Sequence, residues 1–498
     1  MQFDEFYKAF GLSDYPFNTF TTEDEKKKAD LFVEPIDYAL IRSAFRDSRT
    51  IIMSGNRGTG KTAIVYNLME TAPQKALTVY IDDLSSLNDE ASSIDFYQLI
   101  CSFIVNAVME QYIDKGINFK KLSKEDKVFL SLLVSKYMTN STLNALRERI
   151  ERIQLSPFAR GVNRFSGFIQ FALNYGLNVA IKMLNNIIAT NSGLPLIEDM
   201  SATSIFPEVK MSVDISFQSV DSSYALLTKM CKLIKRMGFS ATIVFIDKID
   251  EDTRCTNDAD LIAKFITPLL TDSKLLLCQD IQVVVSIWSI PFDMLKKSVR
   301  TQKFYCPLLR WKNPDLLRAF NQRVKVYSNC QTSRRFDEFF DDTVTQDRMD
   351  LILLLSNHNP RDLWHIFNIL MRVQFERTSN ANRFSSSVID AALMEFVQSF
   401  NYYEYYPCKK NTRKNSMDVY SYINHLLKLR TSSFTANQLN EYAGTGSSTQ
   451  NYISSMQSMG LITRTDEKSR QGVQYSIIDP KINYAIENGI KIHRANLY

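Results

Sequence analysis

The sequence predicts an α/β protein: a parallel sheet with a large, mostly helical insertion, a small helical lid domain and a C-terminal winged helix. The first observation is a glycine-rich loop at 55–62, which joins an apolar run to a helical stretch at 63–69. The second is a set of short apolar runs that predict buried strands. The third is a change of pattern at Asp418, after which three helical stretches precede two short strands. The predicted strands of the main sheet are 50–54, 76–82, 241–247 and 281–286.

Residues 55–62 read Gly-Asn-Arg-Gly-Thr-Gly-Lys-Thr and match the phosphate-binding pattern G-x-x-x-x-G-K-[ST]. Glycines let successive backbone N–H groups surround a triphosphate, and the dipole of the following helix favours an anion. Lys61 is placed for the β and γ phosphates and the Thr62 hydroxyl for Mg²⁺. The alternative is a chance glycine-rich turn. The loop therefore predicts ATP and Mg²⁺ as cofactors, with contacts from Gly55, Asn56, Arg57, Gly58, Thr59, Gly60, Lys61, Thr62 and Ala63.

Composition places broad limits on the protein. The chain has 498 residues, 45% of them hydrophobic, enough for about three domains with a sizeable core. Its net charge of +5, from 59 basic and 54 acidic residues, is too small to indicate a nucleic-acid-binding protein by itself. Seven cysteines and four histidines lie scattered, which favours a reducing, cytoplasmic setting without zinc or disulfides. The N-terminus lacks a signal-peptide pattern and the uncharged stretch 165–181 is too polar for a span, so we expect no membrane contact.

Changes of pattern along the chain set the expected domain boundaries. An N-terminal segment, 1–49, packs on a nucleotide-binding domain, 50–310, which contains an insertion at about 84–240. A helical lid domain at 311–401, a polar linker at 402–417 and the winged helix at 418–498 follow. The insertion is expected to contain helices at 96–112, 127–137, 143–153, 165–181 and 223–237 and a strand at 211–217.

A second motif, Asp247-Lys-Ile-Asp-Glu251, ends the apolar run at 241–247. A carboxylate at a strand tip helps to hold the Mg²⁺ of a bound nucleotide, and Asp247 is placed for that role. Hydrolysis also needs a group that orients or deprotonates the attacking water. Asp250 and Glu251 both qualify, and the sequence does not separate them. The alternative is a solvated acidic turn. The motif predicts a catalytic set of Lys61, Asp247 and one of these two acids.

The order of these features resembles a known group of proteins. Gly11-Leu-x-x-x-Pro-Phe17 and Phe32-Val-x-Pro35 precede the phosphate loop, while a strand ending in D-x-h-D-E and a terminal winged helix follow it. This order resembles bacterial P-loop ATPases of the origin-recognition-like type, which border the AAA+ and STAND groups. The resemblance covers 1–83, 241–400 and the C-terminal module. It departs at Lys248, where AAA+ enzymes normally carry a glutamate, and this departure argues against fast turnover.

The resemblance implies roles for three further residues. Ser286 would sense the γ-phosphate, Arg361 would contact phosphate from the lid domain, and Arg300 would reach a neighbouring molecule's nucleotide as an arginine finger. Each residue has an alternative: an ordinary strand-end serine, a surface arginine at a helix start, and a solvated basic face, respectively.

The resemblance also implies an adenine pocket in the N-terminal segment. Its expected members are Pro16, Phe17 and residues 31–35. For Phe17 the alternative is hydrophobic docking of the segment onto the domain.

The predicted winged helix gives no clear indication of its partner. Its third helix, 448–459, contains no Lys or Arg, although Gln450, Asn451 and Gln457 have side chains that can read base edges. Phosphate neutralisation supplies most DNA-binding energy, so this helix is poorly equipped for it. DNA binding and docking on a protein, including autoinhibitory docking, both remain open.

Together these features predict an ATP-binding and ATP-hydrolysing switch that self-associates or engages a protein partner, with DNA as a further candidate partner. By the resemblance, its setting is antiviral defence or mobile-element DNA transactions. One alternative is a scaffold that binds nucleotide without hydrolysing it, which Lys248 favours. The other is a DNA-binding regulator tuned by nucleotide.

Overall fold

The computed structural model describes residues 2–115, 219–252, 254–255, 257–330, 334–408, 417–469 and 472–494, with isolated positions between 122 and 137. The helices expected at 143–153 and 165–181 and the strand expected at 211–217 lie outside the described residues, as does most of the helix expected at 127–137. The expected helices at the two ends of the insertion are present as α5 (Ser93–Lys115) and α10 (Val220–Arg236).

The main sheet consists of β1 (Ile51–Gly55), β2 (Leu77–Ile81), β3 (Thr242–Ile246) and β4 (Gln282–Trp288), in the order β1-β4-β3-β2. Every residue of β1, β3 and β4 is buried, which accounts for their continuous apolar sequences. β2 and β3 are parallel, with Leu77 opposite Thr242 and Ile81 opposite Ile246. The sequence predicted a strand at 281–286 with Ser286 at its tip. β4 instead continues to Trp288, so Ser286 lies inside the strand.

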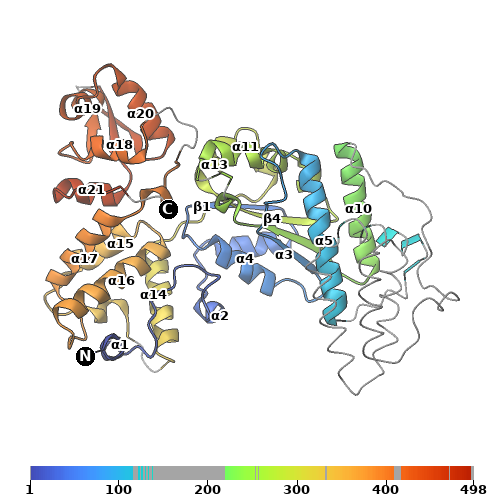
Figure 1. The fold of residues 1–498 in the computed structure, drawn as a ribbon, viewed down its shortest axis with the longest axis horizontal. Coiled ribbons are helices and arrows are strands. Elements are labelled where there is room, and N and C mark those ends of the chain that lie inside the picture. The colour runs from blue at the N-terminus through green and yellow to red at the C-terminus, as the bar shows by residue number, and fades with distance from the viewer. Residues whose placement is uncertain are drawn as a thin grey trace, which may run out of the picture. The chain divides into compact units, whose positions relative to one another are not determined.

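The described residues group into two compact units. One contains residues 71–246 and 267–284, and within it α5 packs against β2 and α10 (Figure 1). The other contains residues 1–70, 247–266 and 285–498. It therefore holds the phosphate loop, the acidic motif, the helical region that follows and the C-terminal module. The predicted boundaries at 310, 401 and 417 remain predictions.

The helical region after residue 311 contains α14 (Asn313–Tyr327), α15 (Gln346–Leu355), α16 (Pro360–Arg377) and α17 (Ser386–Ser399). α17 was not expected from the sequence. Asn359 and Pro360 explain where α16 begins: the Asn359 side chain accepts the N–H of Arg361, and proline suits the first helical position. The apolar sides of these helices and of α1 (Phe3–Ala9) belong to one buried core.

The N-terminal segment is fastened to α14 by a buried ion pair. Arg323 donates to Glu25 at 2.9 Å and to the carbonyl of Pro16 at 2.5 Å, and the Tyr327 hydroxyl donates to Glu25 at 2.7 Å. Phe17 has no exposed surface, and its ring centroid lies 5.2 Å from that of Phe367. The segment is thus held by both charge and apolar packing.

Replacing Arg323 with methionine is expected to destabilise the protein by about 3 kcal/mol, because Glu25 stays buried without its cation. Urea unfolding measures the loss. Lys325→Met on the same helix is the control: Lys325 is exposed, so we expect a change below about 1 kcal/mol. Equal losses in the two variants would contradict a special role for the buried pair.

The C-terminal module contains α18 (Val419–Leu426), β5 (Ser433–Thr435), α19 (Ala436–Ala443), α20 (Thr449–Ser458), β6 (Ile462–Ser469), β7 (Gly472–Ile477) and α21 (Pro480–Glu487). Its strands form an antiparallel sheet in the order β5-β7-β6. α18, α19 and α20 lie where three helices were expected, but α21 was not predicted. The winged-helix assignment remains a prediction.

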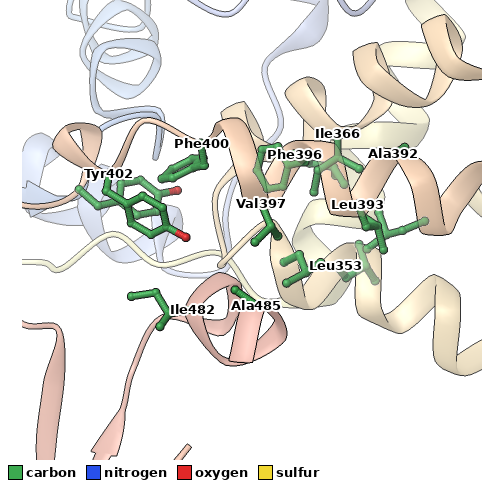
Figure 2. Close-up of a cluster of buried hydrophobic side chains, with 14 of the residues drawn as sticks. Leu353, Ile366, Ala392, Leu393, Phe396, Val397, Phe400, Tyr402, Ile482 and Ala485 are labelled. Atoms are coloured by element: carbon green, nitrogen blue, oxygen red, sulfur yellow. The ribbon is translucent and has the colours of Figure 1, made fainter. Parts of the chain in front are cut away.

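α21 packs against α15 and α17 of the helical region (Figure 1). Ile482 and Ala485 of α21 belong to the same buried cluster as Leu353, Leu393 and Val397 (Figure 2). A continuous apolar core therefore joins the C-terminal module to the helical region.

The remaining short elements complete the described chain. They are α2 (Lys28–Leu31), α3 (Tyr38–Arg46), α4 (Lys61–Glu70), η4 (Ile249–Glu251), α11 (Ala259–Leu270), α12 (Ser273–Leu276), α13 (Ser289–Leu295), η5 (Thr301–Lys303), η6 (Phe336–Phe339), η7 (Tyr402–Glu404) and η8 (Gly446–Ser448). All seven cysteines are free thiols. Within the described residues, none of the helices has both the length and the apolar character needed to span a bilayer.

Candidate functional site

The phosphate loop lies between β1 and α4, and its glycines are required by geometry. Gly58 and Gly60 have φ angles of 79° and 81°, a region that side chains with a Cβ rarely adopt. Lys61, the first residue of α4, donates to the carbonyls of Gly55 at 3.1 Å and Asn56 at 3.0 Å. Burial lowers the pKa of Lys61, against the opposing charges of the nearby acids. A buried ammonium among neutral carbonyls is well placed for an anion.

Side chains from outside the loop hold its shape. Trp311 donates from its indole nitrogen to the carbonyl of Thr59 at 2.9 Å. The Ser289 hydroxyl donates to the Asn56 side-chain oxygen at 2.7 Å, and the Thr59 hydroxyl donates to the Asn56 carbonyl at 2.8 Å. Asn56 and Thr59 therefore act on the loop itself and are not among the residues that line the neighbouring cavity.

Asp247 and Asp250 have different surroundings. Asp247, directly after β3, is 1% exposed and accepts a hydrogen bond from the buried Ser286 hydroxyl. Asp250 is 6% exposed and pairs with the Nε of Arg57 at 2.8 Å. Burial would raise the pKa of Asp250, but Lys61 and Arg57 outweigh it and the pKa is lowered. Asp250 is therefore an ionised partner of the loop arginine.

Glu251 differs from its neighbour in exposure and charge. Its side chain is exposed and lines the cavity beside the loop. Partial burial and the Asp250 carboxylate raise the pKa of Glu251, while Lys248 opposes them. Of the two acids that the sequence left open, Glu251 is the accessible one, whereas Asp250 is buried and paired with Arg57. These properties favour a carboxylate that exchanges a proton.

Lys248 occupies a strained backbone position and anchors the cavity wall. Its φ is 58°, in the left-handed region, and it precedes η4. Its Nζ lies 3.0 Å from a carboxylate oxygen of Glu23 in the N-terminal segment. The residue that departs from the AAA+ pattern thus holds the segment that covers the site.

A cavity of about 410 Å³ lies beside the loop, a usual size for a ligand site. Ser286, Arg300 and Gly55 are described but are not among its lining residues. Arg300 is exposed at the start of η5, so its predicted finger role would need a second molecule. The predicted site residues that line the cavity are Arg57, Gly58, Gly60, Lys61, Thr62, Ala63, Asp247, Asp250, Glu251 and Arg361.

Part of the cavity lining forms an apolar and largely aromatic wall. Of the residues expected in an adenine pocket, Leu31, Phe32, Val33 and Pro35 line the cavity, whereas Pro16 and Phe17 do not, and Phe17 belongs to the hydrophobic core. Further lining residues were not predicted, because they come from α4, the segment before α14, α14 itself and α16. These additional lining residues are Tyr66, Trp311, Arg323 and Trp364.

Arg361 lines the cavity from the first turn of α16. Its Nε donates to the carbonyl of Phe20 at 3.2 Å, and its guanidinium lies 3.5 Å from the Glu404 carboxylate. Arg361 therefore lies at the cavity with long contacts to its partners, and its role as a phosphate contact remains a prediction.

His365, one turn along α16, gives the region a pH dependence. Its ring stacks on Phe20 with centroids 3.8 Å apart, and burial, followed by the charge of Arg361, lowers its pKa to about 4. Above pH 6.5 the His365 ring is neutral in both the folded and the unfolded chain and does not lower the free energy of unfolding. As the pH falls from 6.5 toward 4, only the unfolded chain binds the proton, so the free energy of unfolding decreases.

Replacing His365 with phenylalanine, which keeps the stack on Phe20, is expected to recover up to about 3 kcal/mol of the free energy of unfolding near pH 4. Unfolding at pH 7 and pH 4.5 measures this, and an identical acid loss in both proteins would contradict it.

The oxygen donors at the site fit a magnesium ion. Thr62 and Asp247 both line the cavity, and hydroxyl and carboxylate oxygens are ligands that Mg²⁺ prefers. Within the described part of the chain, no group of three or more His, Cys, Asp or Glu residues is arranged to hold a metal. The ligands that this chain would supply are therefore Thr62 and Asp247.

The fold and this site define the class: an α/β protein with a phosphate-binding loop between a buried strand and the next helix. Among solved structures, the chain is similar to the Walker-type ATPase PABY2304 of Pyrococcus abyssi, with 11% identity, a TM-score of 0.38, and coverage of 95% of this chain and 99% of that chain. It is also similar to Drosophila ORC bound to DNA, with 10% identity, a TM-score of 0.30, and coverage of 97% and 98%. No protein-family model and no curated protein matches the chain. The class therefore rests on the loop and its surroundings.

Proposed function

We propose that this chain binds ATP with Mg²⁺ in the cavity beside the phosphate loop, hydrolyses it, and works as a nucleotide-controlled switch. The observation that carries the proposal is that Lys61, Thr62, Asp247 and Glu251 all line one cavity of about 410 Å³. These residues supply a phosphate-binding cation, two oxygen donors for the metal and a carboxylate for the water. Bound Mg²⁺ would supply charge neutralisation at the phosphates.

Glu251 is proposed as the residue that accepts the proton of the attacking water. Its side chain is exposed at the cavity, and partial burial with the Asp250 carboxylate raises its pKa, which makes it a better proton acceptor. Asp250 is instead proposed to hold Arg57 and so to support the loop. Ser286 would orient Asp247 through its hydroxyl and would not touch the phosphate directly.

The aromatic wall is proposed to receive the adenine base. Phe32, Tyr66 and Trp364 offer flat apolar faces for stacking. Arg361 would exchange its contacts with Phe20 and Glu404 for a phosphate oxygen, so that nucleotide binding alters the first turn of α16. This exchange is the proposed first step of the switch.

The partner is proposed to engage the C-terminal module, as a protein or as DNA, and Arg300 is proposed to act between two copies of the chain. Antiviral defence or mobile-element DNA transactions would be the setting, on the resemblance described above. Light scattering with and without a non-hydrolysable ATP analogue tests self-association. Larger particles with the analogue would support the Arg300 role, and an unchanged monomer would exclude it.

A second candidate is a scaffold that binds nucleotide without turnover. It is favoured by Lys248, which stands beside Asp247 and pairs with Glu23. Phosphate release by the purified protein, measured with Mg²⁺ and with and without DNA, separates the two functions. Release above a Lys61→Ala background supports the switch that hydrolyses ATP. Binding without release supports the scaffold, and absence of binding excludes both.

A further inference from the structure

Asn359 joins the phosphate loop to the start of α16. Its side-chain oxygen accepts the N–H of Arg361 at 3.0 Å, and its amide nitrogen donates to the carbonyl of Arg57 at 2.6 Å. Asn359 is 1% exposed, and a Cβ on Gly58 would lie 2.6 Å from the Asn359 side-chain oxygen. Because the contact is this close and buried, the shape of the loop depends on where Asn359 lies.

The second amide hydrogen of Asn359 points to a linker residue. It donates to the Tyr405 hydroxyl at 2.6 Å, and that hydroxyl donates to Asp362 at 2.7 Å. An amide nitrogen only donates and an ionised carboxylate only accepts, so the direction of both bonds is determined. Tyr405 is 4% exposed, so losing either bond leaves a buried polar group unsatisfied.

This chain of contacts ends on a buried cation in the first turn of α21. The Nζ of Lys481 lies 3.3 Å from Asp362 and 3.5 Å from Asp479, and its side chain has no exposed surface. The ammonium also lies 4.2 Å from the centroid of the Phe400 ring. A buried charge is costly once it loses a partner, so Lys481 and Asp362 are expected to keep their contact or to rearrange together.

Asp362 depends on both of its partners for its charge. Burial raises its pKa to about 6, against the opposing effects of the Lys481 ammonium and the Tyr405 hydroxyl. If α21 moved Lys481 away, Asp362 would take up a proton more readily and would then compete with Tyr405 as a donor.

The acidic motif reaches the same linker by a separate route. Asn257 follows η4 and donates from its side chain to the carbonyl of Tyr403, and its own carbonyl accepts the Cys408 N–H at 3.0 Å. The phosphate loop therefore reaches the linker through Asn359, and the segment after the acidic motif contacts the linker directly. The linker in turn leads to the C-terminal module.

We propose that Asn359 is a positioning residue of the phosphate loop, and that Tyr405, Asp362 and Lys481 make its position depend on the docking of α21. A partner that displaces α21 then lowers nucleotide affinity. By reciprocity of the coupling, bound nucleotide strengthens the docking of α21. The effect on affinity rests on the nucleotide binding proposed above, whereas the effect on the loop does not.

Hydrogen exchange on the full nucleotide-free chain tests the positioning role. Tyr405→Phe removes only the hydroxyl, and exchange at residues 55–60 is expected to become about tenfold faster. Lys481→Met, a change of similar volume, is expected to act in the same direction. The matched control is Tyr402→Phe in the same linker, because the buried Tyr402 hydroxyl has no hydrogen-bond partner among the described residues. Equal exchange of the loop in Tyr405→Phe and wild type overturns the proposal, whether or not Lys481→Met folds.

Titration with a fluorescent ATP analogue tests the coupling to nucleotide. Tyr405→Phe is expected to bind about tenfold more weakly than wild type, and Tyr402→Phe equally well. If wild type binds no nucleotide, the proposed function fails, and the exchange experiment still decides the positioning role. Faster loop exchange with unchanged affinity would overturn the coupling to nucleotide.

Discussion

Replacing Lys61 with alanine is expected to lower the affinity for ATP and ADP more than about 100-fold. The ammonium is buried at the loop and donates to the neutral carbonyls of Gly55 and Asn56, so a phosphate would supply its anionic partner. Titration with a fluorescent ATP analogue measures the loss. Lys297→Ala is the control, because Lys297 is exposed on a segment outside the cavity.

Weaker binding by Lys61→Ala can result from the lost phosphate contact or from a damaged fold. Thermal unfolding of the nucleotide-free variant shows whether the fold is kept, since alanine also leaves two carbonyls without their donor. A folded variant that retains wild-type affinity would remove the phosphate-loop assignment, and with it both candidate functions.

Replacing Glu251 with glutamine is expected to lower ATP turnover about 100-fold or more while nucleotide affinity stays unchanged. The amide keeps the size of the side chain but cannot accept a proton at the cavity. Asp250→Asn is the contrasting variant, because it breaks the buried pair with Arg57. We expect it to lower both nucleotide affinity and the melting temperature, since an uncompensated arginine then remains beside the loop.

Turnover by the two acid variants is measured by phosphate release at saturating ATP, with melting temperature as the measure of folding. Wild-type turnover in Glu251→Gln would exclude this residue as the proton acceptor. Loss of turnover in Asp250→Asn with unchanged affinity and stability would transfer that role to Asp250.

The phosphate loop could be predicted because its chemistry is local. Gly58, Gly60, Lys61 and Thr62 are consecutive or nearly so, and a strand-loop-helix context follows from the apolar residues on either side. Asp247 could be predicted in the same way, since it directly follows a buried strand. The chain segment itself carries all the information that these predictions need.

The roles of Asp250 and Glu251 could not be separated by the same reasoning. Arg57 decides between them, and its side chain reaches Asp250 only after the loop and the acidic motif come together in the fold. For Phe17 the tertiary structure supports the alternative of hydrophobic docking, because the side chain lies fully buried beside Phe367.

α21 was not predicted, because the three helices and two strands expected of a winged helix end before residue 480. Its short sequence, Pro-Lys-Ile-Asn-Tyr-Ala-Ile-Glu, has too few turns to display a long apolar period. Lys481 is buried between Asp362 and Asp479, and Asp362 is far from it in the sequence, so no local pattern indicates this contact.

By itself, the sequence determined the parallel-sheet class, the glycine-rich loop and the place of Asp247 directly after a buried strand, since each depends on neighbouring residues and on backbone freedom at glycine. Only the tertiary structure decided which acid is accessible, which aromatic side chains line the cavity and how Asn359 meets Lys481 through Tyr405 and Asp362. Those outcomes depend on burial and on contacts between residues distant in sequence. The pairing of buried side chains cannot be predicted from neighbouring residues in the sequence. The free-energy cost of a buried polar group without a hydrogen-bond partner arises only once the chain has folded.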